Sequence, residues 1–215
     1  MSIWEKILYK GQSKFNGEVR VTENAGSRRL VADGYTQSQN LSKNPLISHV
    51  YWESMIPENL SLKSDSRVLI LGLAAGTTAK IIRNRFGMVP IDGVEIDPLI
   101  IELGKKFFSL EQPKLNIIVG DAKKFVKNAR HKYDLICIDA FIGKEFPRDM
   151  ETTEFFGKIK KLLKKKGKVT INKIFSGEEE LEELTRITQS VFPSIDVKII
   201  GSGSSQKNVI VTTGV

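Results

Sequence analysis

Hydrophobic residues in this chain form short continuous runs that alternate with stretches of helical spacing, the pattern of strands buried in a parallel sheet. The runs cover residues 68–71, a segment ending at Val94, residues 115–119 and residues 133–139. Helical spacing predicts helices near residues 75–86, 98–109, 122–129, 151–165 and 177–191. The chain is therefore expected to adopt an α/β fold with a mostly parallel sheet.

Both ends of the chain depart from this alternation. Segments 18–22 and 28–32 are joined by Asn24-Ala25-Gly26, residues that tolerate turn geometry, and so predict a β-hairpin. At the other end, strands at 195–200 and 208–212 follow each other without a helix between them. We predict an N-terminal β-hairpin segment at residues 1–60 and a Rossmann-like ligand-binding domain at residues 61–215.

The turn after the first buried strand indicates a nucleotide-like ligand. Gly72 and Gly76 bracket this turn, and Glu95 closes the next strand, where it can accept hydrogen bonds from two ribose hydroxyls. A dinucleotide fingerprint would require glycine in place of Ala74, and a P-loop would require a lysine after Gly76. The pattern is better suited to S-adenosylmethionine and its relatives.

Three predicted strands end in a carboxylate, namely Glu95, Asp121 and Asp139. The carboxyl ends of parallel strands meet at one edge of a sheet, so these acids are expected to face one ligand. Asp121 could accept a hydrogen bond from an adenine amino group, with the Ala122 amide beside it. It is also suited to cap the following helix, and the sequence leaves both roles open.

Together these segments resemble the spermidine/spermine synthase family and its methyltransferase-like relatives over residues 28–175. The resemblance rests on LVADGYTQ at 30–37, YWE at 51–53, LGLAAGT, GVEIDP, VGDAKKF, YDLICIDAF and the segment 152–172. It implies the class I methyltransferase fold, a mostly parallel seven-stranded sheet with helices on both faces. It also implies roles for particular residues: catalytic, Asp139; cofactor-binding, Gly72, Leu73, Ala74, Gly76, Glu95, Ile96, Asp121, Ala122 and Asp139; substrate-binding, Gln37, Tyr51 and Phe141.

The chain departs from the aminopropyltransferases of this family at three positions. Ala75 and Ile142 stand where those enzymes carry acids, and Trp52 stands where they carry a histidine. A polyamine dication needs carboxylates to neutralise its charge and to accept a proton, whereas methyl transfer depends mainly on placing the two reacting atoms. The residues therefore favour an S-adenosylmethionine-dependent methyltransferase with an unidentified acceptor.

Two alternatives stay open. One is a divergent aminopropyltransferase that uses decarboxylated S-adenosylmethionine, which would be strengthened if Glu145, Asp149 or Glu151 folded over the site. The other is a non-catalytic nucleoside-binding or interaction module.

Composition adds expectations about partners. The 215 residues carry a net charge of +8, but much of the excess lies in segment 158–168, where it fits the solvated face of a helix. A nucleic-acid partner is therefore not indicated, and we expect a small-molecule or protein acceptor. The N-terminal hairpin is a candidate surface for a homodimer or tetramer, because family members often oligomerise through it.

The single cysteine, Cys137, excludes an intramolecular disulfide and favours a cytoplasmic protein with a buried, inert thiol. His49 and His131 lack partners at metal-ligand spacing, so no metal site is predicted. The chain has no apolar run near 18 residues, and its N-terminus lacks a signal-peptide pattern, so no membrane association is expected.

Overall fold

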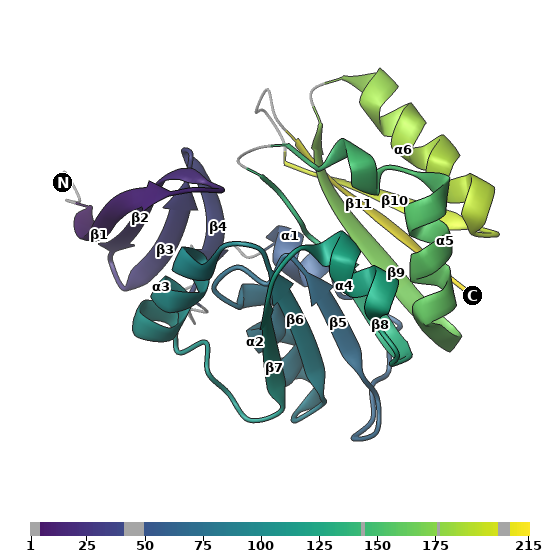
Figure 1. The fold of residues 1–215 in the computed structure, drawn as a ribbon, viewed down its shortest axis with the longest axis horizontal. Helices are drawn as coiled ribbons and strands as arrows, with labels where there is room; N and C mark the ends of the chain where they lie inside the picture. The colour runs from purple at the N-terminus through teal and green to yellow at the C-terminus, as the bar shows by residue number, and fades with distance from the viewer. Residues whose placement is uncertain (1–4, 41–49, 143–144, 176, 202–206) are drawn as a thin grey trace.

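The computed structural model describes residues 5–40, 50–142, 145–175, 177–201 and 207–215. Two sheets organise these residues: a small antiparallel sheet near the N-terminus and a seven-stranded sheet that forms the body of the molecule (Figure 1). The small sheet is a meander of four strands, β1 (Lys6–Ser13), β2 (Gly17–Asn24), β3 (Ser27–Ala32) and β4 (Tyr35–Gln39).

The predicted hairpin corresponds to β2 and β3. Their connection places Ala25 and Gly26 at φ 48° and 78°, the left-handed conformation that a tight turn requires. Strands β1 and β4 were not predicted from the sequence, because β1 mixes polar and apolar residues and β4 reads YTQSQ.

The large sheet has the order β10-β11-β9-β8-β5-β6-β7. Strands β5 to β9 are parallel to one another where they pair, and β11 runs antiparallel to both of its neighbours. The mostly parallel seven-stranded sheet is thus confirmed. Its strands are β5 (Val68–Leu71), β6 (Ile91–Glu95), β7 (Leu115–Val119), β8 (Tyr133–Ile138), β9 (Leu163–Phe175), β10 (Ile195–Ile200) and β11 (Lys207–Gly214).

Five helices lie where the periodicity predicted them, with one of them shortened, and α1 was not predicted. The helix predicted to reach residue 165 ends at Leu162, because Leu163 is buried and pairs with Tyr133 as β9 begins. The helices are α1 (Val50–Ser54), α2 (Thr77–Phe86), α3 (Pro98–Phe108), α4 (Ala122–Asn128), α5 (Thr153–Leu162) and α6 (Glu178–Val191), with a short 3-10 helix at Arg148–Met150.

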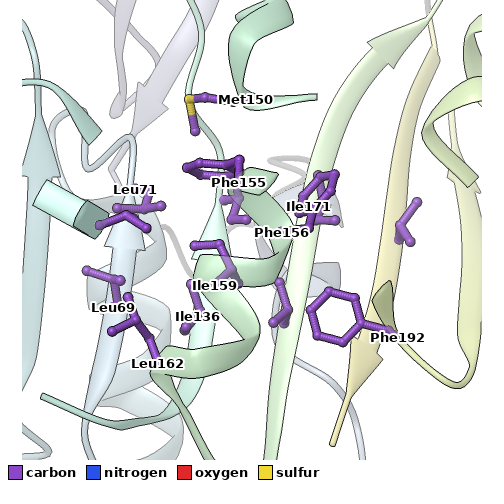
Figure 2. Packing of buried hydrophobic residues seen from close by; sticks show 14 of the residues in the cluster. Leu69, Leu71, Ile136, Met150, Phe155, Phe156, Ile159, Leu162, Ile171 and Phe192 are labelled. Atoms are coloured by element: carbon purple, nitrogen blue, oxygen red, sulfur yellow. The ribbon is translucent and has the colours of Figure 1, made fainter. Parts of the chain in front are cut away.

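Alternate residues of the central strands enter two separate cores. Leu69 and Leu71 of β5 pack with α5, whose Phe155, Phe156 and Ile159 fill the space above the sheet (Figure 2). Val68 and Ile70, on the opposite face of the same strand, share a core with Ile82 of α2 and with the segment that follows α1. Helices therefore cover both faces, which leaves the carboxyl ends of the parallel strands as the accessible edge.

A third core joins the two sheets. Val19, Val21 and Leu30 of the small sheet are completely buried against Ile100 and Phe108 of α3. The small sheet is therefore held beside the carboxyl edge of the large one, where α3 starts (Figure 1).

Candidate active site

The predicted site residues converge at the carboxyl edge because four neighbouring strands end there in register. Gly72 follows β5, Glu95 ends β6, Asp121 follows β7 and Asp139 follows β8. Hydrogen bonds between the strand ends continue the pairing: the Asp139 N–H donates to the Leu71 carbonyl at 2.8 Å. Glu95, Asp121 and Asp139 thus lie at one edge of the sheet, as the local sequence predicted.

The glycine turn is shaped by close contact with its surroundings. Gly72 has φ 89°, and a Cβ there would overlap the carbonyl oxygen of Asp139. Gly76 has φ 87° and packs against Leu110. The turn also points the Ala74 N–H at Glu95, to which it donates at 2.9 Å. Glycine at both ends therefore lets the backbone approach the site closely.

Glu95 is 8% exposed and is held by two backbone donors. Ala74 donates to Oε2, and the Asp97 N–H donates to Oε1 at 3.1 Å. Burial raises the pKa of the Glu95 carboxyl to about 7, and the hydrogen bonds from Asp97 and Ala74 pull it back toward its ordinary value. Each oxygen keeps a second lone pair, so the carboxylate can still accept hydrogen bonds from a ligand.

Asp121 caps α4 through one oxygen. The backbone N–H groups of Lys123 and Lys124 both donate to Oδ1, at 2.7 and 3.1 Å. Among the described residues no hydrogen bond to Oδ2 is present, and Asp121 lines the cleft. The capping role and the adenine-binding role are therefore compatible in geometry, because each uses a different oxygen.

Asp139 stands where two pockets meet. It is partly exposed to them, and its Oδ1 accepts a hydrogen bond from Asn172 at 2.7 Å. Burial raises the pKa of the Asp139 carboxyl to about 6, while the bond from Asn172 lowers it. Burial, with the charge of Asp139 as a second cause, raises the pKa of Tyr51 well above its ordinary value. Asp139 is thus a carboxylate that can take up a proton near neutral pH.

The first pocket lies over the ends of β5 to β8. The predicted residues that line it are Gln37, Gly72, Ala74, Glu95, Ile96, Asp121, Ala122, Asp139 and Phe141. The second pocket shares Gln37, Ala74, Asp139 and Phe141 with the first and adds Tyr51. Leu73 and Gly76 are not brought to either pocket, because Leu73 is 3% exposed inside a core and Gly76 packs on Leu110.

Polar residues distant in sequence complete the two pockets. Asn16, in the turn between β1 and β2, lines the first pocket, and its Nδ2 donates to Asp97 at 2.7 Å. Asn172 of β9 and Asn208 of β11 line the second pocket. No sequence pattern indicated these three residues, since an isolated asparagine is common in turns and on strand surfaces. The second pocket is also lined by Tyr35, Thr36 and Ile174.

Ala75 and Ile142, the two positions where aminopropyltransferases of the resembled family carry acids, do not line the second pocket. Ala75 is 1% exposed, and its N–H donates to the Ser38 hydroxyl of β4 at 2.8 Å. Ile142 is 49% exposed and lines the first pocket. Trp52 is buried and stacks on Tyr51, with ring centroids 4.1 Å apart. The acid of the second pocket, Asp139, is therefore retained despite these departures.

The acids that could have folded over the site differ in placement. Asp149 lines the first pocket and is paired with Lys123. Glu151 forms a largely buried ion pair with Lys173, and Glu145 is exposed. One of the three is thus at the site.

Other expectations concern groups outside the pockets. Cys137 is buried, and burial raises the pKa of its thiol to about 12, so it is a structural residue. Within the described residues there is no cluster of three or more metal-ligating side chains, and His49 lies outside those residues. No helix of the described chain is long and apolar enough to cross a membrane.

Comparison with known proteins identifies the family. The Spermine/spermidine synthase domain family matches residues 41–203. A polyamine aminopropyltransferase of Vibrio vulnificus is 34% identical over 131 residues, covering 59% of this chain and 43% of the relative. One from Sulfurisphaera tokodaii is 26% identical over 168 residues, covering 74% of this chain and 54% of the relative. The chain spans about half the length of the curated relatives it matches.

The fold has a close counterpart among solved structures. A probable spermidine synthase from Corynebacterium glutamicum superposes with a TM-score of 0.83 at 19% identity, covering 97% of this chain and 80% of the other. Human methyltransferase-like protein 13 superposes with a TM-score of 0.63 at 22% identity, covering 70% of this chain and 72% of the other. The class I methyltransferase-like fold that the resemblance implied is thus confirmed.

These comparisons overturn one prediction. The methyltransferase with an unidentified acceptor was wrong, because the matching family and the curated relatives are aminopropyltransferases. The physical reason is that Ala75 and Ile142 were taken as acids lost from around a bound polyamine, yet neither residue lines the second pocket, whose acid Asp139 is retained. The chain belongs to the spermine/spermidine synthase domain family.

Proposed function

We propose that this chain transfers an aminopropyl group from decarboxylated S-adenosylmethionine to an amine acceptor, as in polyamine synthesis. The observation that carries the proposal is the position of Asp139 at the junction of two pockets. One pocket has the acids expected around an adenosine, and the other is lined mainly by hydroxyl, amide and aromatic side chains. The relatives named as polyamine aminopropyltransferases support the same reaction.

The donor would occupy the first pocket. Glu95 would accept hydrogen bonds from the ribose hydroxyls, and Asp121 Oδ2 would accept one from the adenine amino group. The charge of Asp121 and Asp139 along this edge, with that of Glu95 when it is ionised, would attract the sulfonium and the amino group of the donor tail.

The acceptor would occupy the second pocket with its reacting nitrogen at Asp139. The protonated amine would lose a proton to the Asp139 carboxylate and become nucleophilic. The lone pair of the nitrogen would then form a C–N bond to the carbon through which the aminopropyl group is attached to sulfur. The C–S bond would break with its electron pair going to sulfur, so a neutral thioether leaves and the new secondary amine carries the positive charge.

The raised pKa of Asp139 suits this role. A carboxylate whose pKa is about 6 is ionised at pH 7 but is a stronger base than an ordinary aspartate. Tyr51 would line the acceptor path as a neutral hydroxyl, because its pKa is raised well above 10.

The proposal is tested by incubating the purified chain with decarboxylated S-adenosylmethionine and putrescine, and following the aminopropylated amine and 5′-methylthioadenosine by mass spectrometry. We expect equal amounts of both products, and a loss of at least about 100-fold in Asp139→Asn. The control is Asp196→Asn, an exposed residue of β10 that lines neither pocket and should keep the full activity. Absence of transfer with a series of mono-, di- and triamines would refute the proposal.

A further inference from the structure

A chain of two amides ends at Asp139. Asn208 Nδ2 donates to Asn172 Oδ1 at 2.9 Å, and Asn172 Nδ2 donates to Asp139 Oδ1 at 2.7 Å. Three adjacent strands supply these side chains, because β9 pairs with both β8 and β11. Asn172 is 1% exposed, so water does not compete for its amide.

The direction of this chain is fixed by its end. A carboxylate only accepts hydrogen bonds, so Asn172 must turn its NH₂ group toward Asp139 and its carbonyl toward the neighbouring strand. Asn208 then satisfies that carbonyl with its own NH₂. If Asn208 were absent, the buried carbonyl of Asn172 would lose this donor, and its amide would be held only by its bond to Asp139.

We propose that Asn172 and Asn208 are positioning residues that fix the carboxylate of Asp139 and leave its second oxygen for the acceptor nitrogen. This inference rests on the proposed aminopropyl transfer. A hydrogen bond to one oxygen sets the rotation of the carboxylate, and the direction of the free lone pairs follows from that rotation. It also favours the ionised form that accepts a proton.

The surroundings contain other groups that titrate. Tyr51 on α1 and Cys137 on β8 have pKa values raised by burial, so both are neutral across the range in which Asp139 ionises. The remaining titratable groups that line the two pockets are Tyr35 of β4 in the second pocket and Glu95, Asp121 and the Lys123–Asp149 ion pair in the first. Lys173, the residue after Asn172, forms an ion pair with Glu151.

Three matched substitutions test the inference. Asn172→Leu removes the donor to Asp139, and Asn208→Leu removes the group that orients Asn172. Asn116→Leu is the control, because Asn116 also donates to a carboxylate, Asp92, at 2.9 Å, but lies on β7 away from both pockets. The first readout is the pH dependence of kcat/KM for aminopropyl transfer.

We expect Asn172→Leu to move the acidic midpoint of kcat/KM upward by about one pH unit, and Asn208→Leu to move it in the same direction by less. At pH 7 kcat should fall roughly tenfold or more in Asn172→Leu, beyond the loss from ionisation alone, because the carboxylate is no longer held. The Kd for decarboxylated S-adenosylmethionine should stay within about twofold, since Asn172 does not line the donor pocket.

The second readout does not need turnover. The ¹³C signal of the Asp139 carboxyl, assigned by its loss in Asp139→Asn, is followed against pH in each folded variant. An upward shift in Asn172→Leu or Asn208→Leu supports the inference even if no amine is a substrate, a result that would refute only the proposed reaction. An unchanged Asp139 titration in both variants, or an equal shift in Asn116→Leu, would overturn it.

Discussion

Gly72 lies against the backbone of Asp139 so closely that any side chain at position 72 would overlap the Asp139 carbonyl oxygen. Gly72 directly follows β5 and Asp139 directly follows β8, and the two strands are parallel neighbours. The turn that faces the donor is thereby seated on the residue proposed to activate the acceptor. This contact sets the distance between the glycine turn, which would face the donor, and Asp139, which would activate the acceptor.

Gly72→Ala should therefore destabilise the protein by roughly 2 kcal/mol or more. Alanine at φ 89° is strained, and its methyl group would push the Asp139 carbonyl away. Urea denaturation followed by circular dichroism measures the change. The control is Gly120→Ala at the same sheet edge, where an added Cβ meets no atom within 4 Å. Equal stability of the two variants would contradict this packing.

Glu95→Gln should weaken binding of decarboxylated S-adenosylmethionine by about 2–3 kcal/mol, because a charged acceptor of ribose hydroxyls is lost. Calorimetric titration of the folded variant gives the affinity. Glu102→Gln, an exposed residue on the next helix, should bind like the unchanged protein. Unaltered affinity in Glu95→Gln would remove Glu95 from the donor site.

Glu95 should also make stability depend on pH in an unusual direction. Burial raises its pKa from 4.5 to about 7, so between these values the folded protein holds a proton that the unfolded chain has released. Stability from this group is therefore present below pH 4.5 and is lost as pH rises through 7, by roughly 3 kcal/mol in total. The unfolding free energy of the unchanged protein, minus that of Glu95→Gln, should fall by roughly 2–3 kcal/mol from pH 5 to pH 8. A constant difference would show that Glu95 titrates normally.

Asn16→Ala tests how the small sheet is attached. Asn16 and Ser13 both donate to Oδ2 of Asp97, which is 2% exposed and caps α3 through its other oxygen. Loss of the Asn16 bond should cost about 1.5–3 kcal/mol, as expected for a buried bond to a charged group. Thermal unfolding measures it, with Asn128→Ala as control, because the side chain of Asn128 makes an exposed bond within its own helix. Equal losses in both variants would mean that the buried bond adds nothing.

Periodicity predicted β5, β7 and β8 because each is a short, mostly apolar run, whereas β9 reads LKKKGKVTINKIF and was indicated only by the family resemblance of segment 152–172. The acids Glu95, Asp121 and Asp139 could be placed together for the same reason, since each directly follows such a run. Periodicity did not predict strand β4, because it has no apolar pattern and is held in place by tertiary contacts. Thr77 exchanges two hydrogen bonds with the backbone of Gln39, both 2.9 Å long.

Side-chain direction was the part that sequence could not supply. Leu73 is next to Gly72 in the motif, yet it points into the core. Asn172 and Asn208 are 36 residues apart and meet through strand pairing that no local pattern encodes. The wrong prediction of methyl transfer has the same origin. The sequence shows that Ala75 and Ile142 are not acids, but it does not show that neither side chain lines the second pocket. The division at residues 60 and 61 and oligomerisation through the N-terminal hairpin stay predictions.

The most direct test of the account is calorimetric titration of the purified chain with decarboxylated S-adenosylmethionine and, side by side, with S-adenosylmethionine. The two ligands differ by one carboxylate on the tail that must reach Asp139. Repulsion between that carboxylate and Asp139 should make the decarboxylated form bind at least about tenfold more tightly, a difference of about 1.4 kcal/mol. Equal or tighter binding of intact S-adenosylmethionine would contradict aminopropyl transfer.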